Sequence, residues 1–217
     1  MVFTDRTDAG RRLAEALATL RLRAPVLLGL PRGGVVVADA VASALGTQFE
    51  AFVALKVGAP GQEELGVGAV AEELEDPVVS DVAAQVGISE SGLRVLAEDR
   101  RAEVDRRVRL YRGGRALPEV KGAEVVVIDD GLATGVTAEA ALRAIRQKGP
   151  RRLVLAVPVC APDTVARLSS LADDIVFVES PANLQAVGMW YEDFSPTTDD
   201  QVIGILAKRH PPTGSTP

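Results

Sequence analysis

The chain has 217 residues, of which 47% are hydrophobic and 25% charged, so it can form a globular domain with a sizeable core. Its net charge is −6, and no long block of one sign occurs along it. We therefore expect no nucleic-acid partner and no membrane partner, because binding to nucleic acids or to anionic membranes needs a concentrated basic surface. This composition does not exclude a local basic pocket that binds phosphate groups.

Rare residue types narrow the chemistry further. The one histidine, His210, lies in the Pro-rich end "HPPTGSTP", and the one cysteine, Cys160, ends an apolar run, where we expect it to pack in the core. Neither a Ser-His-Asp unit nor a zinc site can be assembled from them. Any chemistry must use carboxylates, Lys or Arg, backbone amides or a hard metal ion.

The N-terminal residues and the apolar runs predict a cytoplasmic protein. The first residues, "MVFTDRTDAG", carry charges where a signal peptide has its apolar core. The longest mostly apolar runs, such as residues 153–161, are too short to span a bilayer. A single cysteine cannot form an internal disulfide, which fits a reducing compartment.

Apolar runs of strand length alternate along the chain with segments of helical period, which predicts an α/β fold with a mostly parallel sheet. Leu13, Leu17 and Leu20 share one face of the first helix, and Gly46 is expected to end the second. The expected helices are 8–22, 35–45, 89–112, 138–148 and 163–171. The expected strands are 26–30, 49–57, 125–128, 152–159 and 174–180.

Three segments depart from this alternation. Residues 58–88 are rich in glycine and acids without a strong period, which predicts a mobile flap and linker. Residues 209–217 are expected to be disordered. The stretch "NLQAVGMWYEDFSPTT" holds the only tryptophan. The helix over 89–112 is expected to be amphipathic and exposed, with an apolar face formed by Leu93, Leu96, Val104 and Val108.

The stretch "VVVIDDGLATGVT", residues 125–137, places two carboxylates and then small or hydroxylic residues where a strand leads into a helix. Ligands bind at the carboxyl ends of parallel strands, and helix N-termini attract phosphate. The pattern predicts a phosphate cradle preceded by Asp129 and Asp130, placed to accept hydrogen bonds from sugar hydroxyls. It is no Walker A loop, because Val136 stands at the lysine position. The alternative is a helix-capping turn whose acids favour the helix dipole.

This stretch resembles the thirteen-residue signature of the type I phosphoribosyltransferases. The resemblance implies that residues 133–137 (Ala133, Thr134, Gly135, Val136 and Thr137) hold the 5′-phosphate of phosphoribosyl pyrophosphate (PRPP). It also implies that Asp129 and Asp130 accept from the ribose 2′- and 3′-hydroxyls. The two adjacent carboxylates would then bind the ribose diol.

A second stretch strengthens the resemblance. "LPRGG", residues 30–34, follows an earlier strand, as the pyrophosphate loop of that family does. Arg32 would contact pyrophosphate, with the amides of Gly33 and Gly34 approaching closely, and the family's non-proline cis peptide would fall at Pro31–Arg32. Lys56 is similar to a family lysine near the pyrophosphate. The alternatives are a solvated arginine in a tight turn and a surface lysine at a strand end.

The resemblance covers nearly the whole chain and is to an uncharacterised bacterial branch with "GAPG…GAVAE" and "VGxWYEDF" segments. It implies one domain over 1–208, with a flap and helical insertion at 58–115, a base-binding hood at 180–198 and a tail at 209–217. Many purine-specific members carry an Asp where this chain has Ala133. In the hood, Trp190 or Tyr191 would stack on the acceptor and Glu192 or Asp193 would meet its edge or a metal, unless these aromatic residues form a packing cluster.

We therefore expect a three-layer α/β/α fold and a transferase that moves the phosphoribosyl group of PRPP to a nitrogen nucleophile such as a nucleobase. Arg32, Lys56, Asp129 and Asp130 would carry the catalysis. Mg²⁺ would be held mainly by PRPP and water. The resemblance also implies a possible homodimer. The alternatives are a regulator on the same fold that binds PRPP or a nucleotide without turnover, and an unrelated α/β nucleotide-binding module.

Overall fold

The computed structural model of the protein describes residues 2–211, without the side chain of Glu64. Its centre is a five-stranded parallel sheet in the order β2-β1-β6-β7-β8. The apolar strands lie between two cores, so that Val125 and Val127 of β6 face one side while Val126 and Ile128 face the other. The strands are β1 (Val26–Gly29), β2 (Phe49–Ala51), β6 (Glu124–Ile128), β7 (Arg152–Val159) and β8 (Asp174–Glu179).

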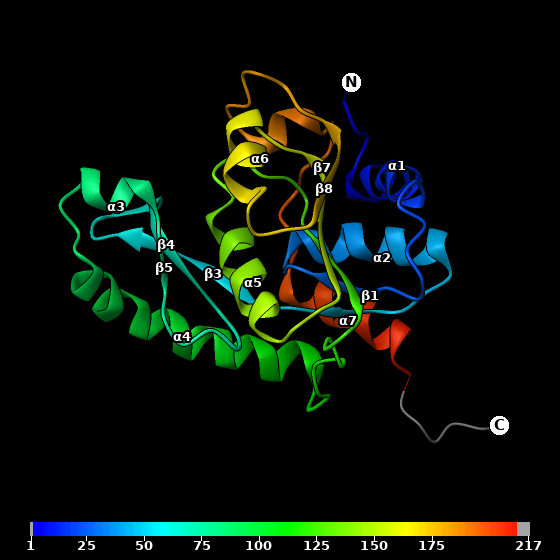
Figure 1. Ribbon diagram of the computed structural model, residues 1–217, viewed down its shortest axis with the longest axis horizontal. Helices are drawn as coiled ribbons and strands as arrows, with labels where there is room; N and C mark the ends of the chain where they lie inside the picture. Colours follow the sequence, from blue (N-terminus) through cyan, green and yellow to red (C-terminus); the bar gives the residue numbers. More distant parts are fainter. Residues whose placement is uncertain (1, 212–217) are drawn as a thin grey trace.

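Helices cover both faces of this sheet, which confirms the expected three-layer α/β/α fold (Figure 1). α1 (Arg6–Ala18) and α2 (Gly33–Leu45) pack together on one face, and α5 (Val136–Gln147) and α6 (Pro162–Leu168) lie on the other. Gly46 ends α2 with a φ of 63°, in the left-handed region that glycine adopts without strain. None of the helices within residues 2–211 is long and apolar enough to cross a membrane.

The expected single strand over 49–57 is wrong, because the chain changes sheets in the middle of it. β2 ends at Ala51, and β3 (Ala54–Ala59) begins a separate antiparallel sheet, in the order β3-β4-β5. At the crossover the Val53 amide donates to Glu72 Oε1 (2.7 Å) instead of to a neighbouring strand. β4 (Gln62–Ala71), β5 (Val78–Val79) and the short α3 (Asp81–Gln85) complete this unit.

The glycine-rich stretch 58–88 therefore has regular structure that its sequence pattern did not predict. β3 and β4 form a hairpin whose two-residue turn, Pro60–Gly61, has the positive φ (74°) at glycine that a type II turn requires. Gly68 is needed for close packing, because a Cβ there would lie 2.5 Å from the Val78 carbonyl oxygen. The mobility expected for this flap stays a prediction.

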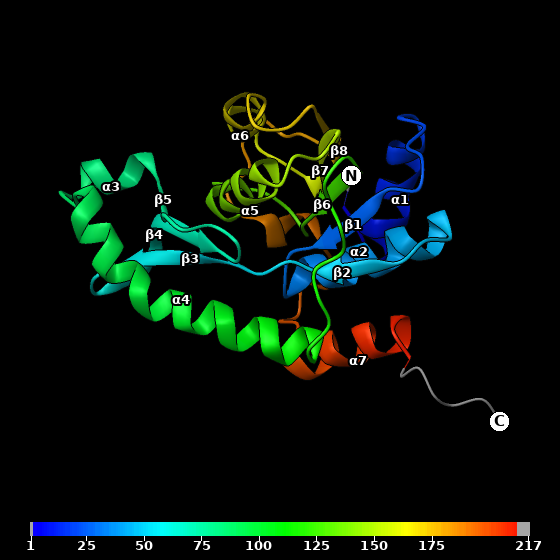
Figure 2. The ribbon, with the colours of Figure 1, turned by 60° about the horizontal axis from the view of Figure 1, so that its bottom comes forward.

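The long helix is confirmed as α4 (Glu90–Arg112), although its apolar face is covered. Leu93 and Val104 are buried, and the helix runs along the small sheet as far as α7 (Figure 2). α7 (Asp199–Arg209) was not expected from the sequence, although Thr198 and Gln201 form a capping box at its start. In the sequence, Gly204 weakens the helical signal of this segment, because glycine disfavours helix.

The expectation that the tail begins at residue 209 is wrong. Arg209 ends α7, and His210 Nε2 lies 2.9 Å from the Phe49 carbonyl oxygen. Residues 212–217 lie outside the described residues, so disorder there stays a prediction. The hood segment, 180–198, is largely irregular and holds one 3-10 turn (Val187–Trp190).

Candidate functional site

Two loops that are about 100 residues apart in sequence meet at the carboxyl edge of the central sheet. They meet because β1 and β6 are adjacent parallel strands, with Gly29 paired to Ile128. The LPRGG loop (30–34) follows β1 and the Asp129–Asp130 pair follows β6. A Cβ on Gly34 would lie 2.7 Å from the Ile128 carbonyl oxygen, and one on Gly33 would overlap the Asp130 carboxylate. The absence of side chains at both glycines thus lets the loop lie directly on the acidic pair.

Two helices begin at this edge without a side-chain cap. Among the described residues, neither Arg32, the N-cap of α2, nor Gly135, the N-cap of α5, accepts a first-turn amide with its side chain. The other long helices do have such caps, at Asp5, Ser89 and Thr198. Free first-turn amides and the helix dipole attract anions. The helix-capping alternative for the acidic pair is therefore not what the geometry shows at α5.

Helix α6 fixes the orientation of residues 133–137, the segment predicted to hold phosphate, which is called the phosphate loop below. Thr164 Oγ1 donates to the Ala133 carbonyl oxygen (2.5 Å), and Arg167 donates to the carbonyl oxygen of Thr134 and to Glu139. In a trans peptide the carbonyl and the next amide point in opposite directions. The amides of Thr134 and Gly135 therefore point away from α6.

The residues of the phosphate loop differ in exposure. Thr134 is exposed, Ala133 and Thr137 are partly buried, and Val136 is buried against the core. Gly135 has a φ of 65°, and a Cβ there would lie 2.6 Å from Thr164 Cγ2. Both facts require glycine at the N-cap of α5. Thr164 and Arg167 were not expected to belong to the site, because nothing in their local sequence indicates a contact 31 to 33 residues away.

Asp129 and Asp130 form a crowded pair of carboxyls. Burial raises the pKa of Asp129 well above its ordinary value, and the Asp130 carboxylate raises it further. Burial also raises the pKa of Asp130, whereas Arg6 lowers it. Asp129 Oδ1 accepts the Asp130 amide (2.8 Å), and the Tyr191 hydroxyl donates to the Asp130 carbonyl oxygen (2.5 Å). Carboxylates that are costly to bury are typical of functional sites.

Arg6, the first residue of α1, is a member of this site that sequence reasoning missed. Its Nε donates to Asp130 Oδ2 (2.8 Å) and its Nη1 donates to the Ser195 carbonyl oxygen (2.9 Å). Its guanidinium carbon also lies 3.9 Å from the centre of the Phe194 ring. No local pattern signals a contact across 124 residues.

Arg32 lies in the LPRGG loop after a cis Pro31–Arg32 peptide bond, as the family resemblance implied. Its Nη1 atom is 3.8 Å from Asp199 Oδ1, at the start of α7. The Tyr111 hydroxyl donates to the same Asp199 oxygen (2.6 Å) and lowers the pKa of Asp199. α7 therefore takes part in placing Arg32.

Lys56 lies on β3 of the small sheet, opposite Ala69 on β4. Its aliphatic stem runs beside Gly66, where a Cβ would be 3.0 Å from Lys56 Cδ and 3.8 Å from Val136 Cγ1. The small sheet thus brings Lys56 close to the start of α5, beside the phosphate loop.

In the hood, Tyr191 and Phe194 pack with Phe3 in an aromatic cluster, which was the alternative to a role in binding the acceptor. Tyr191 is buried, with ring centroids 5.3 Å from Phe3 and 4.9 Å from Phe194. Trp190 is partly exposed, so stacking of an acceptor on it stays a prediction. Asp193 is exposed and accepts the amide and hydroxyl of Ser195 (2.9 and 2.5 Å).

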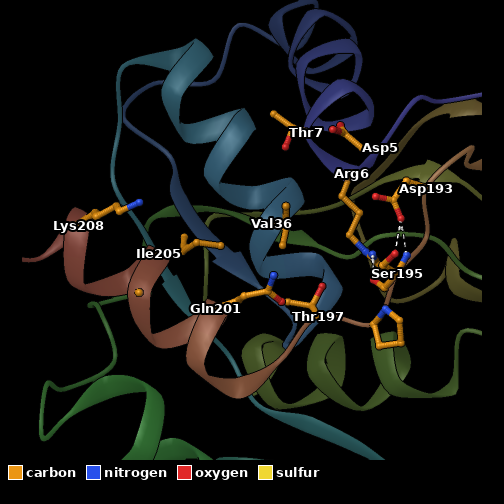
Figure 3. Close-up of a pocket in the computed structure, with 12 residues that line it drawn as sticks. Asp5, Arg6, Thr7, Val36, Asp193, Ser195, Thr197, Gln201, Ile205 and Lys208 are labelled. Carbon is orange, nitrogen blue, oxygen red and sulfur yellow. Dashed lines mark hydrogen bonds between the residues drawn. The ribbon is translucent and has the colours of Figure 1, made fainter.

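A cavity of about 470 Å³ opens between α1, α2 and α7, beside the hood (Figure 3). Arg6, Asp193 and Ser195 line one end of it, and Lys208 lies at the other. Val36 and Ile205 supply apolar surface between them. Arg6 therefore lies between this cavity and the Asp129–Asp130 pair.

The chain is similar to known proteins in sequence and in structure. Residues 5–192 match the family model of the phosphoribosyl transferase domain. Two Mycobacterium tuberculosis proteins, from strains CDC 1551/Oshkosh and ATCC 25618/H37Rv, are named "Putative phosphoribosyl transferase". Each is 40% identical over 209 residues, which is 96% of this chain and 47% of the relative. The chain thus spans about half the length of these curated relatives.

The crystal structure of TT1426 from Thermus thermophilus is similar over its whole length. It is 46% identical, with a TM-score of 0.80, and the match covers 96% of this chain and 99% of that one. The family model matches well over half of the chain, and the chain belongs to the type I phosphoribosyltransferase family.

Proposed function

We propose that this chain transfers the 5-phosphoribosyl group of PRPP to a nitrogen nucleophile and releases pyrophosphate. The observation that carries the proposal is the pair of uncapped helix N-termini, those of α2 and α5, on either side of Asp129 and Asp130. PRPP has two anionic ends and a diol between them. An edge with two anion sites and two carboxylates between them suits that chemistry.

Each part of PRPP has a candidate partner. The outward amides of the phosphate loop would hold the 5′-phosphate, and Asp129 and Asp130 would accept the two ribose hydroxyls. The amides after Arg32 would hold pyrophosphate, with the guanidinium of Arg32 beside it. Lys56 would add a positive charge near the phosphate groups.

In the reaction the bond from C1′ to the pyrophosphate oxygen breaks and a bond from C1′ to nitrogen forms. The bonding electrons leave with pyrophosphate, and the nucleophile gives up its proton after attack. Catalysis would come from positioning and from stabilising charge on the leaving group by Arg32 and the α2 amides. At Ala133 the chain has no carboxyl to take the proton, so we expect an acceptor that loses it readily or a base elsewhere.

Magnesium would arrive on PRPP, because phosphate oxygens and water are its preferred ligands. When bound it would neutralise part of the pyrophosphate charge.

The first test is calorimetric titration of Mg²⁺–PRPP into the wild-type protein and into the double variant Asp129→Asn/Asp130→Asn. We expect binding to the wild type and at least about tenfold weaker binding to the variant, because amides accept diol hydroxyls without the charge. The matched control is Asp173→Asn/Asp174→Asn, which alters an adjacent acidic pair at the opposite edge of the sheet, where β8 begins.

Pyrophosphate release with a panel of nitrogen heterocycles then separates an enzyme from the regulator on the same fold. Release that depends on the heterocycle supports transfer. Binding of PRPP without release from any heterocycle would favour the regulator, and no binding to the wild type would refute the PRPP site.

A further inference from the structure

We propose that Arg6 is a positioning residue, which holds the Asp130 carboxylate charged and correctly oriented for the ribose diol. This inference rests on the proposed function and assigns a role to a residue outside both sequence motifs. It begins from the geometry of the Arg6 guanidinium. Figure 3 shows this side chain reaching from α1 toward Ser195 at the end of the cavity.

Arg6 is held on three sides. Its Nη1 donates to the Ser195 carbonyl oxygen (2.9 Å), and its guanidinium carbon lies 3.9 Å from the centre of the Phe194 ring. Its Nε then donates to Asp130 Oδ2 (2.8 Å). The side chains of Arg6 and Asp130 are only 11% and 18% exposed, so solvent screens this pair weakly. The planar guanidinium therefore ties the acidic pair to both α1 and the hood.

The surroundings of Asp130 make this partner necessary. The charged and titratable groups that face it are Asp129 beside it, Arg6 from α1 and Tyr191 from the hood, whose hydroxyl donates to the Asp130 backbone rather than to its carboxylate. The Asp130 carboxylate raises the pKa of Asp129, and Arg6 is the cation in direct contact with Asp130. Without Arg6 the pair would retain a proton to higher pH and lose a hydrogen-bond acceptor for the diol.

The test compares three variants of α1. Arg6→Gln removes the charge, Arg6→Lys keeps the charge but has no planar fork to bridge Asp130 and Ser195, and Arg12→Gln is the matched control. Arg12 lies on the same helix, pairs with Asp8 (2.8 Å) and approaches the Phe3 ring (5.4 Å), as Arg6 does with its own partners. Thermal melting of each variant shows that it is folded.

The first measurement needs no ligand. Carbon-13 NMR of aspartate carboxyls, assigned with Asp129→Asn and Asp130→Asn, follows titration of the pair. We expect its apparent pKa values to rise in Arg6→Gln and to stay unchanged in Arg12→Gln. Unchanged values in Arg6→Gln would overturn the electrostatic role.

The second measurement is the Kd for Mg²⁺–PRPP at pH 6, 7 and 8.5, expressed as the ratio of variant to wild type so that titration of PRPP itself cancels. For Arg6→Gln we expect about tenfold weaker binding at pH 6, narrowing toward pH 8.5 as the pair ionises. For Arg6→Lys the ratio of Kd values should not vary with pH. Binding should still be weaker than in the wild type at every pH, because lysine cannot bridge Asp130 and Ser195. A purely structural role would give Arg6→Gln a deficit that does not vary with pH, and would overturn the inference.

Failure of the inference is distinct from failure of the proposed function. If the wild type binds PRPP and Arg6→Gln binds it equally well at every pH, only the role of Arg6 is refuted. If the wild type does not bind PRPP, the proposed function fails, and the carboxyl titration still decides whether Arg6 keeps Asp130 charged.

Discussion

At the scale of single residues, Asp129 and Asp130 are placed at a cost to stability. Asp129 is surrounded by the end of β6, the LPRGG loop and a second carboxyl, and burial raises its pKa. A carboxyl whose pKa is higher in the folded than in the unfolded state favours folding when protonated. That contribution is present at a pH below the unfolded pKa and is lost as pH rises through the folded pKa. At neutral pH the charged pair therefore destabilises the ligand-free protein.

Asp129→Asn should accordingly stabilise the ligand-free protein at pH 8 while weakening PRPP binding. The gain should shrink toward pH 4.5, because the raised pKa favours uptake of a proton by the folded wild type as pH falls. Each pKa unit of elevation is worth about 1.4 kcal/mol. Urea unfolding at the two pH values measures it, with the exposed Asp99→Asn of α4 as the control for losing one negative charge. An equal or lower stability of Asp129→Asn at pH 8 would contradict the prediction.

At the scale of elements, glycine has different structural roles in two helices. Gly34 lies in the first turn of α2, where a Cβ would lie 2.7 Å from the Ile128 carbonyl oxygen and 2.9 Å from Asp129 Cα. Gly204 lies in the middle of α7, lines the cavity of Figure 3, and has no atom within 4 Å of the Cβ position. The first glycine is required by close approach of two loops. The second leaves space beside the helix.

Alanine at these two positions should therefore change stability in opposite directions. Gly204→Ala should stabilise the protein by about 0.5–1 kcal/mol, because alanine restricts the unfolded chain and favours the helix. Gly34→Ala should destabilise it by about 1–3 kcal/mol, because the loop cannot move away from β6 without breaking their contact. Chemical denaturation of both variants measures the difference, and a destabilised Gly204→Ala would show that the space beside α7 is needed.

At the scale of the whole molecule, a buried ion pair joins α4 to the end of β4, beside the crossover between the two sheets. Arg112, at the end of α4, donates to Glu72 Oε2 (2.5 Å), and Glu72 Oε1 accepts the Val53 amide at the crossover between β2 and β3. Both side chains are less than a tenth exposed, and burial raises the pKa of Glu72. The acid of the "GAVAE" segment thus holds the small sheet, and Lys56 on it, in place against the central sheet.

Arg112→Met should destabilise the protein by about 3–5 kcal/mol at pH 7.5, because it leaves the Glu72 carboxylate buried without its opposite charge. The loss should be smaller at pH 5.5, since Glu72 can then take up a proton. The double variant Arg112→Met/Glu72→Gln should recover much of it, because glutamine still accepts the Val53 amide. Unfolding midpoints at both pH values test this, and equal losses in the single and double variants would speak against it.

The sequence by itself determined the α/β class, most helices and strands of the central sheet, and the two loops of the candidate site. These features are local: apolar runs, helical periods, and glycines or acids at fixed spacing after a strand. It misassigned 49–57, 58–88 and the start of the tail, because each depends on partners distant in sequence: the Val53 amide on Glu72, β4 on β3 and β5, and His210 on Phe49. Only the tertiary structure decided that Arg6, Thr164, Arg167 and Asp199 belong to the site. Their contacts span from 31 to 167 residues, and hydrogen bonds or ion pairs between groups so far apart leave no periodic pattern in the chain.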